Sequence, residues 1–249
     1  MLVKVVLVDV NPKVVKAWQE TFEGNPEVEI VHGSMLEQHV SAWVSPTNSH
    51  ARMDGGVDGV IKKYLGGKIE KKVQAAIKST YGGLLPVGHA TCVATDEPLP
   101  RFLISTPTMV SSSEDISETM NVALAAAAAF QAVHMQNERL PGSIRSVALP
   151  GLGAATGRVP VEICADLMWT AYDLFREHAF SDFAAMRAAL EEQLGDLGPT
   201  STEGAKKKIH VAPGIAPKPK ELPPEEDEDF DDAEDEDDED EDFDDAEDD

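Results

Sequence analysis

The sequence predicts an α/β fold, a three-layer α/β/α sandwich with helices on both faces of a mixed, largely parallel sheet. Short apolar runs rich in β-branched residues alternate along the chain with longer segments whose apolar residues recur at helical spacing. The first run, residues 3–8, is continuously apolar, as expected of a strand covered on both faces. Because 42% of the 249 residues are hydrophobic, the chain can fill one core but scarcely two large ones.

The alternation assigns the elements in order. Asn11 and Pro12 supply a start signal for the first helix, and Gly82 and Gly83 end the third. The fourth helix is rich in alanine, whose small side chain permits close packing on a sheet. The expected strands are residues 3–8, 28–32, 42–45, 89–94, 101–106 and 146–149, and the expected helices are residues 12–23, 57–65, 68–80, 116–135 and 161–178.

The chain is expected to continue past the folded domain, which we place at residues 1–180. An additional helix is predicted at residues 181–194. Residues 195–224 are rich in Gly, Pro, Ser, Thr and Lys and predict a flexible linker, because they cannot bury enough apolar area to fold. Residues 225–249 predict a disordered acidic tail that increases solubility, binds a protein partner or covers a pocket of its own domain. One phenylalanine-containing acidic block, residues 229–235, recurs at residues 242–248.

The net charge of -25 is concentrated in the acidic tail. Residues 225–249 hold 21 of the 46 acidic residues, which leaves 25 acids against 21 bases in the other 224 residues. The body therefore has an ordinary charge, and the tail would repel phosphates. For these reasons we expect no direct binding of nucleic acid.

Cysteine, histidine and hydropathy patterns exclude several other classes of protein. Cys92 and Cys164 are too few for a disulfide framework, and the seven histidines show no spacing typical of metal ligands, so we expect no metal site and no cofactor. No stretch approaches the ~18 apolar residues of a membrane span. The N-terminus lacks a small-residue cleavage site, and the expected location is the cytoplasm.

Polar and glycine-rich residues follow the third expected strand. Residues 45–48, Ser-Pro-Thr-Asn, end the strand, and residues 53–59, Met-Asp-Gly-Gly-Val-Asp-Gly, lead into a helix. Gly55 and Gly56 lack the Cβ atoms that would keep main-chain N–H groups away from a phosphate. The helix that follows offers its positive N-terminus to the anion. This loop therefore predicts a binding site for a phosphorylated nucleotide.

Individual residues of the first loop have two readings each. Asn48 is a ligand contact or closes an Asx turn at the strand end. Val57 and Asp58, in the first helical turn, are candidate ligand contacts. Asp58 alternatively serves as a helix cap and dipole partner. The sequence alone leaves both alternatives open.

A second glycine-rich loop follows the last expected strand. It contains Gly151, Gly153 and Gly157, and three glycines in seven residues again suggest approach of the main chain to a phosphate. Since parallel strands end at the same edge of a sheet, both loops are expected to lie there. The strand that ends in Asp9 is also typical of a dinucleotide-binding Rossmann domain, but no Gly-x-Gly-x-x-Gly segment precedes it.

These two loops, in this order, resemble those of the macro domain family, over roughly residues 4–175. Members bind ADP-ribose, and some hydrolyse it from modified proteins or from related metabolites such as ADP-ribose 1″-phosphate. The family's Asn-Ala-Ala-Asn appears as residues 45–48, and its Gly-Gly-Gly-Val-Asp-Gly loop appears as residues 53–59, which keep the core Gly-Gly-Val-Asp-Gly. The resemblance implies that Asn48 orients the distal ribose and that Asp58 positions or activates water.

The remaining candidate ligand contacts include departures from the family pattern. Where the family commonly has an Asp that reads adenine, this chain has Ser34, followed by Met35; serine accepts a hydrogen bond without the charge that strengthens it. Ala154 and Ala155 replace a small polar residue and a glycine. By the resemblance, the second loop holds the diphosphate with Gly151, Gly153, Ala154, Ala155, Thr156 and Gly157.

Three functions remain open from the sequence. The domain hydrolyses ADP-ribose from a substrate, captures ADP-ribose without turnover, or uses a degenerate macro fold for assembly while its acidic tail binds a protein partner. Arg158 is expected either to pair with a phosphate in compensation for the altered second loop or to lie on the surface.

Overall fold

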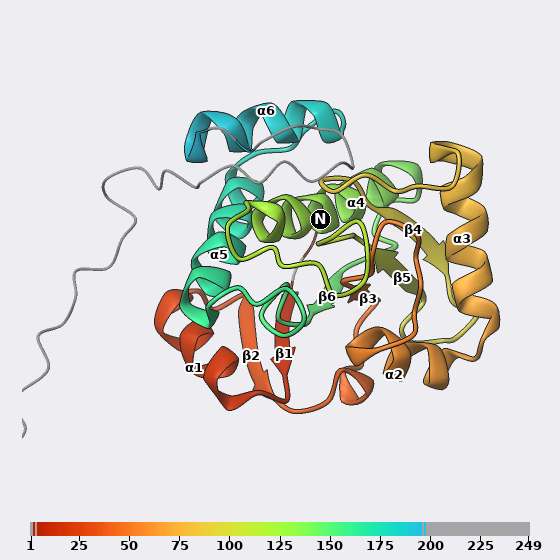
Figure 1. The fold of residues 1–249 in the computed structure, drawn as a ribbon, viewed down its shortest axis with the longest axis horizontal. Helices are drawn as coiled ribbons and strands as arrows, with labels where there is room; N and C mark the ends of the chain where they lie inside the picture. The colour runs from red at the N-terminus through yellow and green to blue at the C-terminus, as the bar shows by residue number, and fades with distance from the viewer. Residues whose placement is uncertain (1, 3, 196, 198–249) are drawn as a thin grey trace, which may run out of the picture. The chain divides into compact units, whose positions relative to one another are not determined.

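The structure is a computed structural model that describes residues 2, 4–195 and 197. Its centre is a six-stranded sheet in the order β2-β1-β6-β3-β5-β4 (Figure 1). The four pairings that join β2, β1, β6, β3 and β5 are parallel, and β4 pairs antiparallel with β5. The strands are β1 (Lys4–Asp9), β2 (Val28–His32), β3 (Ala42–Ser45), β4 (Thr91–Ala94), β5 (Phe102–Ser105) and β6 (Ser146–Leu149).

The sheet is covered on both faces because alternate side chains of a strand point to opposite sides. In β1, Val5 and Leu7 belong to one buried cluster, and Val6 and Val8 belong to the other. All four side chains are at most 2% exposed. This two-sided burial explains why the strand has a continuous apolar run.

Helices form the two outer layers. The first cluster joins the sheet to α1 (Pro12–Thr21), α4 (Asn121–Arg139), α5 (Val161–Glu177) and α6 (Phe183–Leu194). The second joins it to α2 (Gly56–Leu65) and α3 (Lys68–Tyr81), and a short 3₁₀ helix, η1 (Met35–Glu37), contributes Met35. The predicted three-layer α/β/α class is therefore confirmed.

The alanine-rich α4 is the most deeply buried helix of the fold. Every residue from Val122 to Val133 is at most 5% exposed. The predicted start of this helix, at residue 116, is wrong by five residues. Ile116 is instead held in the preceding loop, where its N–H donates to the carbonyl of Gly157 at 3.1 Å and its side chain is fully buried.

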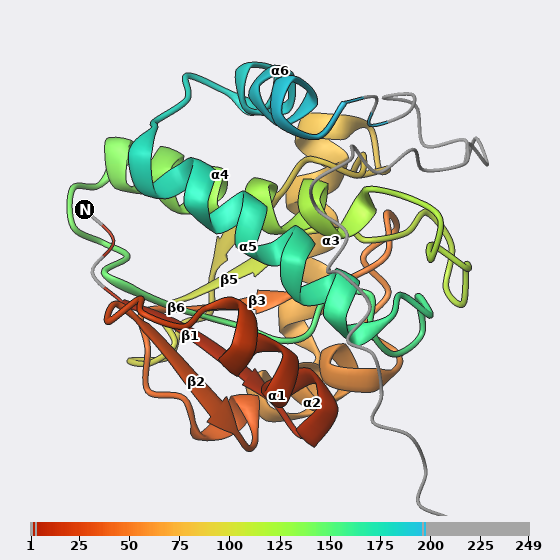
Figure 2. The same ribbon diagram turned by 90° about the vertical axis from the view of Figure 1, so that its left-hand side faces the viewer.

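The last described helix, α6, packs outside α4, as both ribbon views show (Figures 1 and 2). Asp182 caps it by accepting hydrogen bonds from the N–H groups of Ala184 and Ala185, both at 2.9 Å. Met186 and Leu190 are fully buried. Apart from residues 195 and 197, the predicted linker and acidic tail lie outside the described residues, and the division of the chain stays a prediction.

The tight packing of α4 predicts that larger side chains will not fit. Replacing the fully buried Ala127 by leucine should lower the free energy of unfolding by about 1–3 kcal/mol, because three more heavy atoms must enter a filled interior. Urea denaturation measures the change. The matched control is Ala188→Leu, at an exposed position of α6, with an expected change within about 0.5 kcal/mol. Equal losses in the two variants would contradict this account of the packing.

Candidate functional site

The two glycine-containing loops leave the sheet at one edge. β3 and β6 are neighbouring parallel strands, with Ala42 opposite Val147 and Trp43 opposite Ala148. The first loop follows Ser45 at the end of β3, and the second follows Leu149 at the end of β6. The arrangement expected from a parallel sheet is therefore present, and the candidate site lies at the carboxyl edge.

The first loop ends in an open turn at the start of α2. Gly56 has a φ of +54°, which glycine adopts without strain, whereas Gly55 is extended at -158°. Both residues are exposed, and a Cβ added to either would meet no atom within 4 Å. No side chain of the described residues caps α2. A helix start with open glycines and no cap is the arrangement that suits an anionic ligand.

Asp58 lies just inside α2 and is 9% exposed. It does not cap its own helix; its Oδ1 accepts a hydrogen bond from the hydroxyl of Ser45 on β3 at 2.5 Å. Burial raises the pKa of the Asp58 carboxyl to about 7, and the negative charge of Asp54 acts in the same direction. The hydrogen bond from Ser45 opposes both effects. Asp58 can therefore gain or lose a proton near neutral pH.

Asn48 closes the turn after β3. Its Oδ1 accepts hydrogen bonds from the N–H groups of His50 at 3.0 Å and Arg52 at 3.3 Å. Its Nδ2 donates to the carbonyl of Arg52 at 3.3 Å and to the hydroxyl of Ser112 at 3.1 Å. The side chain therefore forms an Asx turn, and its contact with Ser112 ties the β3 loop to the loop before α4. Its contact with a ligand stays a prediction.

The glycines of the second loop face the protein interior. A Cβ on Gly151 would lie 2.8 Å from Oδ2 of Asp9, and one on Gly153 would lie 2.8 Å from a methyl of Val122. A Cβ on Gly157 would lie 2.7 Å from the carbonyl oxygen of Gly153. Internal packing therefore requires glycine at these positions, a reason different from the approach to phosphate suggested by the sequence.

Asp9 links the ends of β1 and β6. Its Oδ1 accepts from the N–H of Asn11 at 2.8 Å and its Oδ2 from the N–H of Gly151 at 3.1 Å. In the sequence, Asp9 indicated only a Rossmann domain, and Ser45 stood out only as the first residue of the stretch 45–48. Their positions at or just beyond strand ends were the available signal, but their partners are distant in sequence.

The other predicted site residues have mixed surroundings. Ser34 caps η1 by accepting from the N–H of Leu36 at 3.2 Å, and Met35 is 5% exposed within the core. Val57 is half-buried against the α2–α3 side of the core. In the second loop, Ala154 is half-buried, whereas Ala155 and Thr156 are exposed.

Arg158 follows the second loop and has a φ of +59°. Its exposed guanidinium pairs with the carboxylate of Asp115 at 3.4 Å. This pair holds the residue toward the loop before α4. Its predicted contact with phosphate stays a prediction.

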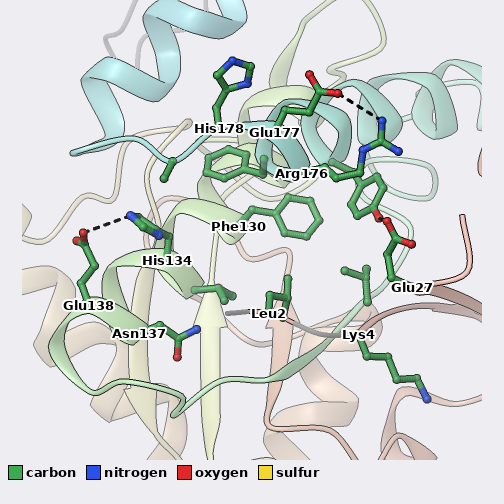
Figure 3. A pocket seen from close by; sticks show the side chains of 15 residues that line it. Leu2, Lys4, Glu27, Phe130, His134, Asn137, Glu138, Arg176, Glu177 and His178 are labelled. Atoms are coloured by element: carbon green, nitrogen blue, oxygen red, sulfur yellow. Dashed lines mark hydrogen bonds and ion pairs between the residues drawn. The ribbon is translucent and has the colours of Figure 1, made fainter.

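A cavity of about 740 Å³ lies at the opposite, amino edge of the sheet (Figure 3). It is lined by the start of β1 and the C-terminal halves of α4 and α5, with Phe130 at its centre. Its polar groups are largely paired: Tyr172 donates to Glu27 at 2.5 Å, and His134 contacts Glu138 at 3.3 Å. Two helices turn their negative C-terminal ends toward this cavity, whereas α2 begins without a side-chain cap at the carboxyl edge, which makes the open turn the better candidate for phosphate.

The described part of the chain, residues 2, 4–195 and 197, lacks two further features. No group of three or more His, Cys, Asp or Glu side chains there is arranged to hold a metal ion. No helix there is long and apolar enough to cross a membrane.

The fold and the open turn define an α/β domain whose candidate site resembles those that bind nucleotide phosphates. The macro domain family model matches residues 44–168. A macro domain-containing protein of Streptomyces nogalater is 30% identical over 172 residues, 63% of this chain and 90% of the relative. An uncharacterized protein of Aquifex aeolicus is 32% identical over 142 residues, 57% of this chain and 78% of the relative. The chain belongs to the macro domain family, which confirms the resemblance.

The chain is also similar to solved macrodomains. That of Mycobacterium tuberculosis DarG gives a TM-score of 0.49 at 20% identity, covering 59% of this chain and 90% of that chain. The Oceanobacillus iheyensis macrodomain with ADP gives a TM-score of 0.49 at 18% identity, covering 65% of this chain and 88% of that chain.

The packing of the second loop predicts a contrast between two glycines. Gly157→Ala should lower the free energy of unfolding by about 2–3 kcal/mol, because its methyl group would overlap main-chain and Ile116 atoms. Gly55→Ala, with an extended φ and open space, should change it by less than about 0.5 kcal/mol. Thermal unfolding of both variants measures the difference. A stable Gly157→Ala protein would show that the loop is not packed in this way.

The burial of Asp58 predicts a dependence of stability on pH. Because the folded-state pKa lies near 7, above the ordinary 3.8, the carboxyl stabilises the fold at low pH and loses this contribution as pH rises from about 4 to 7. Relative to wild type, Asp58→Asn should therefore gain up to about 4 kcal/mol over that range and nothing more above it. Urea denaturation at several pH values gives the comparison. A constant difference between the two proteins would contradict the raised pKa.

Proposed function

We propose that this protein binds ADP-ribose, or a related ADP-ribosyl nucleotide, at the carboxyl edge of its sheet. The observation that carries the proposal is the uncapped, open turn at Gly55 and Gly56, next to the strand end that holds Asp58. Main-chain N–H groups without intrahelical partners attract phosphate at such a turn. Membership in the macro domain family supports the same ligand.

In this proposal the diphosphate lies between the two loops. They leave adjacent strands, and both have exposed residues, including Gly55 and Gly56 in the first loop and Ala155 and Thr156 in the second. The distal ribose is placed next to Asn48 and Asp58. A ribose hydroxyl would take the place of the Ser112 hydroxyl as partner of the Asn48 amide.

We further propose that the site hydrolyses ADP-ribosyl linkages. A general base works best when its pKa is near the working pH, and the Asp58 carboxyl meets this condition. Asp58 takes a proton from water, the water oxygen bonds to the anomeric carbon of the distal ribose, and the bond from that carbon to the modified group breaks. The leaving group then receives the proton. Positioning and electrostatics carry this reaction, so a cofactor is not required.

A second candidate function is capture of ADP-ribose without turnover. All hydrogen-bonding groups of the Asn48 side chain already have protein partners. If Asn48 keeps these partners when the ligand binds, the ribose is held less firmly and the protein acts as a reader.

Calorimetry with ADP-ribose, followed by a de-modification assay, separates these functions. We expect binding by the wild type, and a loss of turnover of about a hundredfold or more in Asn48→Ala and Asp58→Ala. The control is Asp96→Asn, at an exposed carboxylate that pairs with Lys72 away from the loops. Absence of binding heat would contradict the nucleotide assignment and favour a role in assembly. Binding without turnover would support the reader.

A further inference from the structure

The Asp58 carboxyl has a single hydrogen-bond partner in the described part of the chain. That partner is the hydroxyl of Ser45, the last residue of β3, which is 0% exposed. The O···O distance of 2.5 Å is that of a direct hydrogen bond. Strand end and helix start are therefore joined by one contact between two buried side chains.

The two oxygens of Asp58 have different surroundings. Oδ1 is held by Ser45, whereas Oδ2 has no hydrogen-bond partner among the described residues. Oδ2 is also not one of the side-chain polar atoms that are both unpaired and fully enclosed. One oxygen is thus fixed inside the protein, and the other is unpaired in the described part of the chain and not fully enclosed.

We propose that Ser45 is a positioning residue of this site: its hydroxyl holds Oδ1 of Asp58 and thereby turns Oδ2 toward the ligand. The identity of the ligand rests on the proposed function, but the hydrogen bond and its effect on the carboxyl do not. Without the hydroxyl, the carboxyl would lose both its orientation and the one contact that favours its ionised form.

Other charged groups around α2 do not replace Ser45. Asp54, in the turn before the helix, disfavours ionisation of Asp58. On the same helix, Lys62 pairs with Glu70 of α3 at 2.7 Å. Glu37 of η1 is exposed. Removing the Ser45 hydroxyl therefore leaves burial and the charge of Asp54 unopposed, and the direction of the change is toward the protonated carboxyl.

The experiment is a ¹³C NMR titration of aspartate carboxyl carbons in the full-length protein. Asp58 is identified by the signal missing in Asp58→Asn, and hydrated aspartates titrate near pH ~4, well below it. In Ser45→Ala the Asp58 midpoint should rise by about one pH unit. Ser45→Thr, which keeps the hydroxyl, should return it toward the wild-type value.

Ser105 provides a matched control. It lies opposite Ser45 on β5 and is also 0% exposed, but its hydroxyl has no partner in the structure. Ser105→Ala thus removes the same atom from a neighbouring buried position without breaking a hydrogen bond. Its Asp58 midpoint should match that of the wild type, and thermal melts confirm that each variant is folded.

The second arm is the pH profile of ADP-ribosyl hydrolysis. The acid limb should move upward with the NMR midpoint, giving a roughly fivefold loss near pH 7 in Ser45→Ala as the ionised fraction falls from about half to about a tenth. If the wild type shows no turnover, the hydrolytic function fails and the titration alone decides the role of Ser45. An unchanged midpoint in Ser45→Ala, or a wild-type midpoint near 4, would overturn the proposal.

Discussion

Parallel pairing of β3 with β6 is the constraint on which the candidate site depends. Parallel strands must all end at one edge, so the loops after Ser45 and Leu149 leave the sheet side by side although more than a hundred residues separate them in the chain. The pairing is possible because both faces of the sheet are covered and each strand is apolar on both sides. Interior packing thereby determines where polar chemistry can be placed.

The chemistry at this edge depends on a difference in burial between the Asp58 carboxyl and the glycine turn beside it. Asp58 is enclosed enough to keep a proton near neutral pH, yet one of its oxygens is unpaired among the described residues and is not fully enclosed. The adjoining turn offers N–H groups in the open. A ligand with a phosphate and a sugar could use both features together, because the turn attracts the phosphate and the carboxyl can accept or donate a proton. The amino-edge cavity, although large, combines paired polar groups with helix C-termini and lacks this pairing of functions.

Most of the fold could be predicted from the sequence, because apolar runs and turn residues are local signals. The start of α4 could not, since Ile116 is kept out of the helix by Gly157, a residue far along the chain. Ile163 of α5 is 43% exposed although it is apolar, because the sequence of a helix does not fix which of its sides meets the core. In the site, the open turn was visible locally. The partner of Asp58 and the reason for Gly157 depend on residues brought together only by folding.

The glycines of the first loop and those of the second loop are needed for different reasons. Neighbouring atoms leave no room for a Cβ at Gly151 and Gly157. A homologue that no longer bound a ligand would therefore still need glycine at both positions. The fold does not require glycine at position 55, because the main chain of Gly55 is extended and the space around it is open. Among homologues, substitution of Gly55 would therefore indicate that ligand binding at this turn has been lost. Retention of the second-loop glycines would indicate only that the fold is kept.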